Sequence, residues 1–313
     1  MLSNMNEQLI YQSIAVPLAA AGQLHIMRFY CDKSKLGPPV FMLHGALSCG
    51  EGFYAGDGSG LACYLARQGY DVFVGDLRGR GKSQPPLCKN ADFGSHELIT
   101  EDIPALLACV AEQRGNAPQL WVGHGWGGVL LSAYYARFGE RAARVEKMIQ
   151  FGVRRQCPAT RFRSQWLSGL IYSLAPLLIK AAGLFPLKRL GIGSSDQSAG
   201  CFNDYRQWSE SADWLDLKDG FSYAQAAANR PWPASIYIAS KTDTVLGHPQ
   251  DVRRFISSLG EHDSRLLLLS RRDGNKRNYN HNELVSHRDG DSDYFPTLLQ
   301  WLQESSPQSA LGS

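Results

Sequence analysis

The stretch VGHGWGG, residues 122 to 128, has the form of a catalytic turn without its catalytic residue. An apolar run ends here and a helical pattern begins, and a serine at the apex of such a turn would present its hydroxyl as a nucleophile. Gly125 occupies the apex. Glycine reaches strained backbone conformations at little cost, so the turn can form, but it carries no oxygen for attack.

Two further glycine-containing turns follow predicted strands. The run that ends at His44 continues into Gly45 and Ala46, and a turn of this kind can leave a backbone N–H free to face a ligand. The loop RGRGKS, residues 78 to 83, has the glycines and lysine of a phosphate-binding loop but lacks the required spacing between them. We interpret this second stretch as a structural loop.

Strands and helices must position these turns. Six short apolar runs alternate with helical patterns, which indicates an α/β fold with a mostly parallel sheet flanked by helices. The predicted strands are Val40 to His44, Asp71 to Gly75, Leu120 to Gly123, Met148 to Phe151, Ser235 to Ala239 and Arg265 to Ser270. The predicted helices are Gly60 to Gln68, Glu97 to Gln113, Gly127 to Arg137, Pro249 to Leu259 and Phe295 to Leu302. Weak alternation over Gln8 to Tyr30 predicts an antiparallel pair at the sheet edge.

One segment, Arg154 to about Arg230, interrupts this alternation. It contains three tryptophans and a long apolar stretch but no convincing strand. We interpret residues 154–230 as a helical cap inserted between two strands of a core formed by residues 1–153 and 231–313.

The apolar stretch within the cap, residues 166–187, carries a single charge, Lys180, and has basic flanks. It is long enough to span a bilayer, but Pro176 and the central lysine argue against a span. Two interpretations remain: a helix pair packed on the core, which we prefer, or an acyl-binding lid that touches a membrane surface. Both imply an apolar pocket under the cap.

Composition and charge exclude other classes of protein. The 32 basic and 29 acidic residues leave a net charge of +3, too small to favour a nucleic-acid partner. Seven cysteines are scattered without zinc spacing, which indicates reduced thiols. The N-terminus lacks the pattern of a secretion signal. We therefore expect a cytoplasmic protein with no cofactor, no metal and no nucleic acid.

In order and spacing these motifs resemble the α/β-hydrolase superfamily, in particular its esterase and lipase branch. The family's oxyanion turn is similar to residues 44–46, and its strand and following loop are similar to residues 69–83. Its Gly-x-Ser-x-Gly nucleophile elbow is similar to residues 123–127, with Gly125 in place of serine. The resemblance covers nearly everything outside the cap, and it implies a hydrophobic carboxylic ester or acyl ligand.

The family's chain order of nucleophile, acid and histidine implies two more site residues. Asp243 stands where the acid belongs, although a turn or helix-capping role is the alternative. His281 stands where the histidine belongs, before the closing helix. The competing histidines are His248, His262 and His287.

The resemblance also implies two oxyanion donors, the backbone N–H groups of Ala46 and Trp126, each typically worth ~3 kcal/mol. No other serine replaces the missing nucleophile, because Ser59 and Ser195 lack the elbow pattern. Three hypotheses remain. In the first, the chain is a non-catalytic, ligand-binding pseudo-hydrolase, like the N-myc downstream-regulated proteins. In the second, a water molecule activated by the histidine and the acid replaces the serine. In the third, the glycine is an introduced change that inactivates a serine esterase.

Overall fold

The computed structural model describes residues 8–19, 22–139, 144–157 and 166–304. Its centre is a single sheet of β1 (Ile10–Pro17), β2 (Gln23–Tyr30), β3 (Pro39–Leu43), β4 (Asp71–Asp76), β5 (Gln119–His124), β6 (Val145–Phe151), β7 (Ala234–Ser240) and β8 (Ser264–Leu269). The strand order is β1-β2-β4-β3-β5-β6-β7-β8. The pairs β1–β2 and β2–β4 are antiparallel, and every other pair is parallel. The predicted α/β class, the six core strands and the antiparallel edge pair are confirmed.

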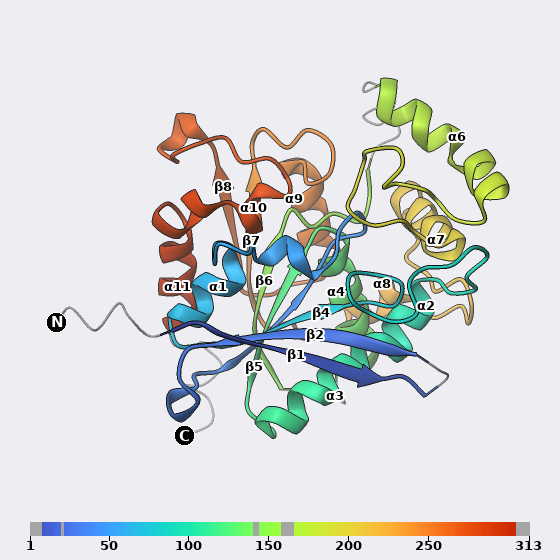
Figure 1. Cartoon of the computed structure of the whole chain (residues 1–313). Helices are drawn as coiled ribbons and strands as arrows, with labels where there is room; N and C mark the ends of the chain where they lie inside the picture. Colours follow the sequence, from blue (N-terminus) through green and yellow to red (C-terminus); the bar gives the residue numbers. More distant parts are fainter. Residues whose placement is uncertain (1–7, 20–21, 140–143, 158–165, 305–313) are drawn as a thin grey trace.

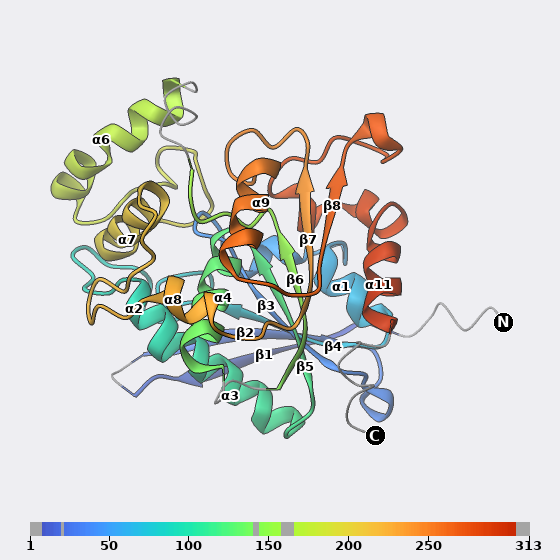
Figure 2. The ribbon, with the colours of Figure 1, turned by 180° about the vertical axis from the view of Figure 1, so that it is seen from behind.

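Helices cover both faces of this sheet (Figures 1 and 2). One face packs against α1 (Leu61–Arg67), α10 (Glu283–Ser286) and α11 (Phe295–Gln303). The other face packs against α3 (Ile103–Arg114), α4 (Trp126–Phe138), α8 (Tyr223–Ala228) and α9 (Pro249–Ser258). Strand β3 shows why both faces are apolar: Val40 and Met42 enter the first layer, and Phe41 and Leu43 enter the second. Successive strand side chains alternate between faces, so a continuous apolar run suits a sheet buried on both sides.

The helix predicted at residues 97–113 is interrupted, which corrects the prediction of one continuous helix. The chain forms α2 (Ser95–Glu97), a π-helical turn (Leu98–Asp102) and then α3. Pro104 lies in the first turn of α3 and has no N–H, so the regular ladder cannot continue across this point. The turn places Asp102 against Arg78, whose backbone N–H and Nε both donate to its carboxylate.

Between β6 and β7 the chain forms α6 (Trp166–Ala182), α7 (Ala199–Glu210) and α8. Figures 1 and 2 both show α6 as the outermost helix, with α7 between it and the rest of the fold. A small apolar cluster joins α6 to α7 and consists of Ala175, Phe185, Leu187 and Phe202. Within the described ranges, no helix has both the length and the hydropathy that a membrane crossing needs. Short 3-10 turns lie at Lys33–Lys35, Gly50–Phe53, Arg271–Asp273 and Arg288–Ser292.

Candidate functional site

The turn at Gly125 joins the end of β5 to the start of α4. Its backbone has φ of 52° and ψ of −121°, a combination that side-chain-bearing residues adopt only under strain. The glycines on either side are required for close packing. A Cβ at Gly127 would lie 2.3 Å from the carbonyl oxygen of His44, and one at Gly123 would lie 2.3 Å from Cα of Gly128. The sharp strand-to-helix turn expected from the sequence is therefore present.

Asp243 and His281 form a buried pair above this turn. His281 Nδ1 lies 2.8 Å from Asp243 Oδ2, and the two side chains are only 13% and 4% exposed. The other carboxylate oxygen accepts hydrogen bonds from the N–H groups of Val245 and Leu246. Burial alone would raise the pKa of Asp243, but the His281 hydrogen bond, the imidazole charge and the N–H groups of Gly247 and Leu246 hold it at about 2. The acid therefore stays ionised and fixes the imidazole.

This depressed pKa predicts a pH-dependent stability. Because the folded-state pKa of Asp243 is about 2, against an ordinary value of 3.8, the ionised group stabilises the fold by about 2 kcal/mol. That contribution is fully present above about pH 4 and is lost as the pH falls through about 2. Urea unfolding of the chain and of Asp243→Asn should differ more at about pH 6 than at about pH 3. Asp263→Asn, at an exposed position, is the control; a gap that is equal at both pH values contradicts the prediction.

The imidazole of His281 faces the empty position at Gly125. A Cβ added at Gly125 would lie 2.9 Å from His281 Nε2, and its third-nearest neighbour, Cα of Gly45, would be 4.0 Å away. The structure thus brings together Gly125, Asp243 and His281, of which the first and last are 156 positions apart in the chain. His281 Nε2 has no side-chain oxygen at position 125 to act on.

The two predicted oxyanion donors lie in the wall of the same cavity. Ala46 and Trp126 both line it, and in the described part of the chain neither N–H has a hydrogen-bond partner. Trp126 is the first residue of α4, so its N–H lies outside the helical ladder. The N–H of Ala46 shares a rigid peptide plane with the carbonyl of Gly45. His44 Nδ1 donates to that carbonyl at 2.9 Å and thereby fixes the direction of the Ala46 N–H.

Two histidines that the sequence reasoning left without a role support this arrangement. Burial lowers the pKa of His44 to about 4, so the neutral ring can accept from the N–H of Leu77 while it donates to Gly45. Burial, and then the proximity of His281, lower the pKa of His124 to about 3. His124 Nε2 donates to the backbone carbonyl of His281 at 3.0 Å, and the two rings lie 4.5 Å apart. The sequence signal was the position of each histidine beside a motif glycine.

The competing residues lie elsewhere. His248 accepts a hydrogen bond at the start of α9, His262 lies beside Tyr237, and His287 lies beside Arg277. Ser59 donates to Asp57, and neither Ser59 nor Ser195 lines the cavity. At the end of β4, just before the glycine-rich loop, Asp76 accepts hydrogen bonds from the N–H groups of Gly50 and Lys82 and from His25. This network agrees with a structural role for that loop.

The cavity beside Gly125 has a volume of about 250 Å³. Its wall is mainly apolar, with Leu47, Phe185, Leu187, Ile192, Phe202, Val245 and Leu246. Arg154 also borders it, and its guanidinium donates to the carbonyl of Leu246 and to the hydroxyl of Tyr205. Because α7 and the segment after α6 supply much of this wall, the inserted helices and the core together enclose the space.

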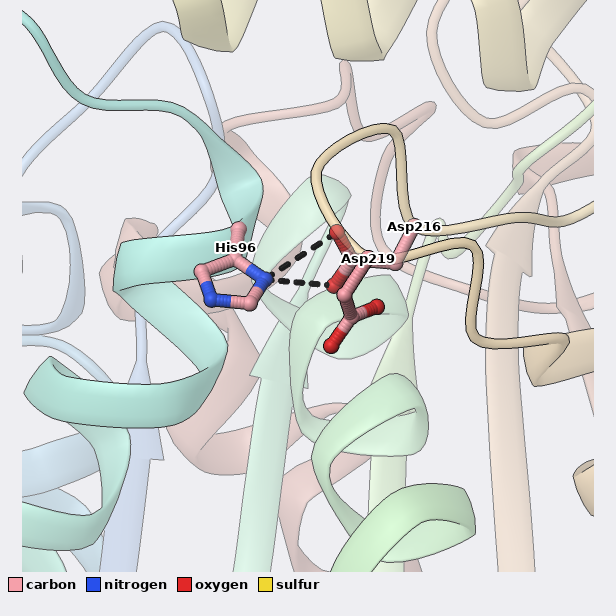
Figure 3. Close-up of side chains that lie close together, drawn as sticks. All are labelled: His96, Asp216 and Asp219. Atoms are coloured by element: carbon pink, nitrogen blue, oxygen red, sulfur yellow. Dashed lines mark hydrogen bonds and ion pairs between the residues drawn. The ribbon is translucent and has the colours of Figure 1, made fainter.

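A second cluster of chemistry-bearing side chains lies apart from this cavity. His96 Nδ1 lies 2.9 Å from a carboxylate oxygen of Asp216, and Asp219 is next to them (Figure 3). These ligand atoms are close enough together to hold a cation. Arg137, however, pairs with both aspartates, and the hydroxyl of Tyr223 donates to Asp216. The guanidinium already supplies the positive charge, so we interpret the cluster as an ion-pair network that joins α2 and α4 to the segment before α8.

Comparison with known proteins identifies the fold. A family model described as the alpha/beta hydrolase fold matches residues 38–149. This protein has the α/β-hydrolase fold. The matched residues include the Ala46 turn and the Gly125 elbow, and they end before Asp243 and His281.

The hydrolase-fold protein has lipases among its curated relatives. It is 27% identical to Lipase 1 of Drosophila melanogaster over 132 residues. This aligned stretch is 40% of this chain and 29% of the relative. It is 33% identical to a putative lysosomal acid lipase/cholesteryl ester hydrolase of Crotalus adamanteus over 97 residues. This aligned stretch is 29% of this chain and 24% of the relative. The matches thus span about a quarter of the relatives' length.

Solved structures extend the likeness in fold over nearly the whole chain. A bromoperoxidase from Bacillus anthracis aligns with a TM-score of 0.59 and 15% identity, covering 94% of this chain and 100% of that one. A thermophilic esterase from Thermogutta terrifontis aligns with a TM-score of 0.56 and 14% identity, covering 93% and 98%. At these identities the alignments establish the fold alone.

Proposed function

We propose that this α/β-hydrolase-fold protein slowly hydrolyses hydrophobic carboxylic esters, with a water molecule in place of the serine nucleophile. The observation that carries the proposal is the geometry of His281. Its Nδ1 is held by Asp243 at 2.8 Å, and its Nε2 lies 2.9 Å from the point where a side chain at Gly125 would begin. The lipase relatives support an ester as the substrate class.

In the proposed reaction, His281 Nε2 takes a proton from water while the water oxygen attacks the ester carbonyl carbon. The carbonyl oxygen becomes an oxyanion, stabilised by the N–H groups of Ala46 and Trp126. The imidazolium, stabilised by Asp243, then returns its proton to the leaving alkoxide. Ester and water become acid and alcohol, and no covalent enzyme intermediate forms.

The inserted helices fit the role of a cap in this proposal. We assign residues 154–230 to the cap and residues 1–153 and 231–313 to the core. Phe185, Leu187 and Phe202 of the cap contribute apolar wall to the cavity, so they would contact the hydrophobic part of the ester. Burial of such a group stabilises binding by about 25 cal/mol per Å² of apolar surface removed from water.

The test is a pre-steady-state measurement with a medium-chain p-nitrophenyl ester. We expect slow turnover that is linear from the first cycle, without a burst of p-nitrophenol, because no acyl-enzyme accumulates. A fluorophosphonate probe should leave the chain unlabelled for the same reason. A burst equal to the enzyme concentration, or stoichiometric labelling, would mean that another side chain is the nucleophile.

A second candidate function is ligand binding without turnover. The observation in its favour is that position 125 has no attacking atom while an apolar cavity of about 250 Å³ remains beside it. Native mass spectrometry of the purified chain separates the two functions. Retention of an acyl ligand together with no measurable hydrolysis of any ester favours binding alone.

We also propose that the outer face of α6 contacts lipid surfaces. Leu174 and Leu177 are 42% and 65% exposed there. Exposed basic side chains lie on the same helix and shortly after it: Lys180, Lys188 and Arg189. Exposed leucines beside basic residues suit an anionic interface.

We expect Leu177→Ser to reduce co-flotation with phosphatidylserine-containing vesicles several-fold, because a leucine side chain contributes about 1.5–3 kcal/mol when fully buried. Leu217→Ser, at a residue that is 54% exposed outside this helix, is the matched control. Equal flotation of the two variants would show that α6 does not contact the vesicles.

A further inference from the structure

Arg80 is a partly buried cation that has no ion-pair partner among the described residues. It lies in the loop after β4, and its Nη1 is shielded from solvent and has no hydrogen-bond partner in the described chain. No carboxylate of the described ranges lies within ion-pairing distance of its guanidinium. Burial lowers the pKa of Arg80, yet an arginine stays charged at neutral pH. A charge in this position is costly unless an anion joins it.

The neighbouring Arg78 shows the contrast. Its guanidinium pairs with Asp102 and Glu101, and its backbone N–H also donates to Asp102. The same loop therefore holds one arginine with two ion-pair partners and one, Arg80, with none among the described residues. Ion pairs within the protein therefore explain how Arg78 is accommodated, but they do not explain Arg80.

Arg80 borders a second cavity, of about 20 Å³, that adjoins the large one. The two cavities share four wall residues: Gly45, Ala46, Trp126 and Gln197. Arg80 therefore lies behind the wall that carries the candidate oxyanion donors. A space of this volume holds about one water-sized group, which suits one oxygen of a carboxylate.

The other ionisable groups facing this small cavity do not supply a negative charge. His44 is neutral, since burial lowers its pKa to about 4. Cys201 keeps its proton, since burial raises its pKa to about 12. The carboxylate whose charge acts on Arg80 from a distance, that of Asp196, accepts the backbone N–H of Lys188 and is outside the cavity wall. The described residues around Arg80 thus favour an anion from outside the protein.

We propose that Arg80 forms a binding subsite for the carboxylate of an aliphatic acid whose hydrocarbon tail occupies the large apolar cavity. Ala46 and Trp126 border both spaces, and their N–H groups, unpartnered in the described chain, would donate to the same carboxylate. Gly125 leaves the approach from the large cavity free of a side chain. The subsite binds the acid whether or not esters are hydrolysed, so it goes beyond the proposed function and its test needs no turnover.

The test compares octanoate with 1-octanol by isothermal titration calorimetry. We expect octanoate to bind at least about tenfold more tightly than octanol, and Arg80→Met to abolish the difference. Hydrogen bonds to charged groups account for about tenfold to a hundredfold in affinity. Arg80→Lys keeps the charge and should retain part of the preference. Arg253→Met, at an exposed position on α9, should bind octanoate as the parent chain does.

Thermal unfolding without ligand controls for misfolding. We expect Arg80→Met to unfold at or above the temperature of the parent chain, because it removes an uncompensated charge. Octanoate should raise the unfolding temperature of the parent chain more than that of Arg80→Met. Equal affinities for octanoate and octanol in the parent chain overturn the proposal. A folded Arg80→Met that keeps the octanoate preference overturns it as well, whatever the ester assays show.

Discussion

Gly125→Ser is expected to raise the rate of ester hydrolysis by about 10³-fold or more. The substitution adds a hydroxyl beside His281 Nε2, where the imidazole can act as its general base. Loss of the nucleophile in a complete serine site costs about 10⁶-fold in turnover, which bounds the possible gain. The measurement is kcat/KM for p-nitrophenyl butyrate and octanoate, together with fluorophosphonate labelling, which should become stoichiometric.

The same substitution is expected to lower stability. The backbone at Gly125 has a positive φ that strains any residue with a Cβ, at a cost of about 1–3 kcal/mol. A Cβ 2.9 Å from His281 Nε2 also requires the ring to move by a few tenths of an ångström. Urea unfolding measures this cost, and the gain in rate should appear in spite of it.

Gly125→Ala is the matched control because it adds the same Cβ and strain without the hydroxyl. It should lose stability to the same extent and gain no activity. Gly125→Ser combined with His281→Ala should also gain none. If Gly125→Ser folds but acquires neither turnover nor label, the assignment of the elbow or of its partners is wrong. If it becomes an ordinary burst-phase esterase, the remaining site is that of a serine esterase without its nucleophile.

His281→Ala in the parent chain is expected to reduce residual ester hydrolysis by about 10²- to 10⁴-fold. This is the range that a positioned general base contributes. Asp243→Asn should have a smaller effect in the same direction, because it leaves the imidazole present but no longer fixes its tautomer. Initial rates at substrate concentrations well below KM report the change directly.

Added imidazole provides a sharper readout for this variant. The truncated side chain leaves a space beside Asp243, and free imidazole in that space should restore part of the activity to His281→Ala but not to Asp243→Asn. His287→Ala is the matched control, because His287 lies beside Arg277 and outside the cavity wall. Hydrolysis that survives in His281→Ala at the parent rate would contradict the water mechanism.

Much of the scaffold follows from local sequence pattern. The strand Val40 to Leu43 is apolar at every position, which predicts a strand buried on both faces, and the structure places it inside the parallel sheet. The sharp turn at Gly125 was equally predictable, because Gly123 and Gly127 supply the close approaches that a strand-to-helix turn needs. The continuous helix at residues 97–113 was not, because a proline near its middle allowed either a kink or the observed π-helical turn.

The sequence by itself determined the α/β class, the turn at Gly125 and the absence of a side-chain oxygen at its apex. Only the tertiary structure decided that Asp243 Oδ2 and His281 Nδ1 lie 2.8 Å apart beside that turn, and that Arg80 has no ionic partner while Arg78 has two. The physical reason is the distance along the chain over which each interaction acts. Backbone propensity and apolar periodicity act between residues close in the chain, whereas pairing, burial and charge compensation depend on which distant segments the packed sheet brings together.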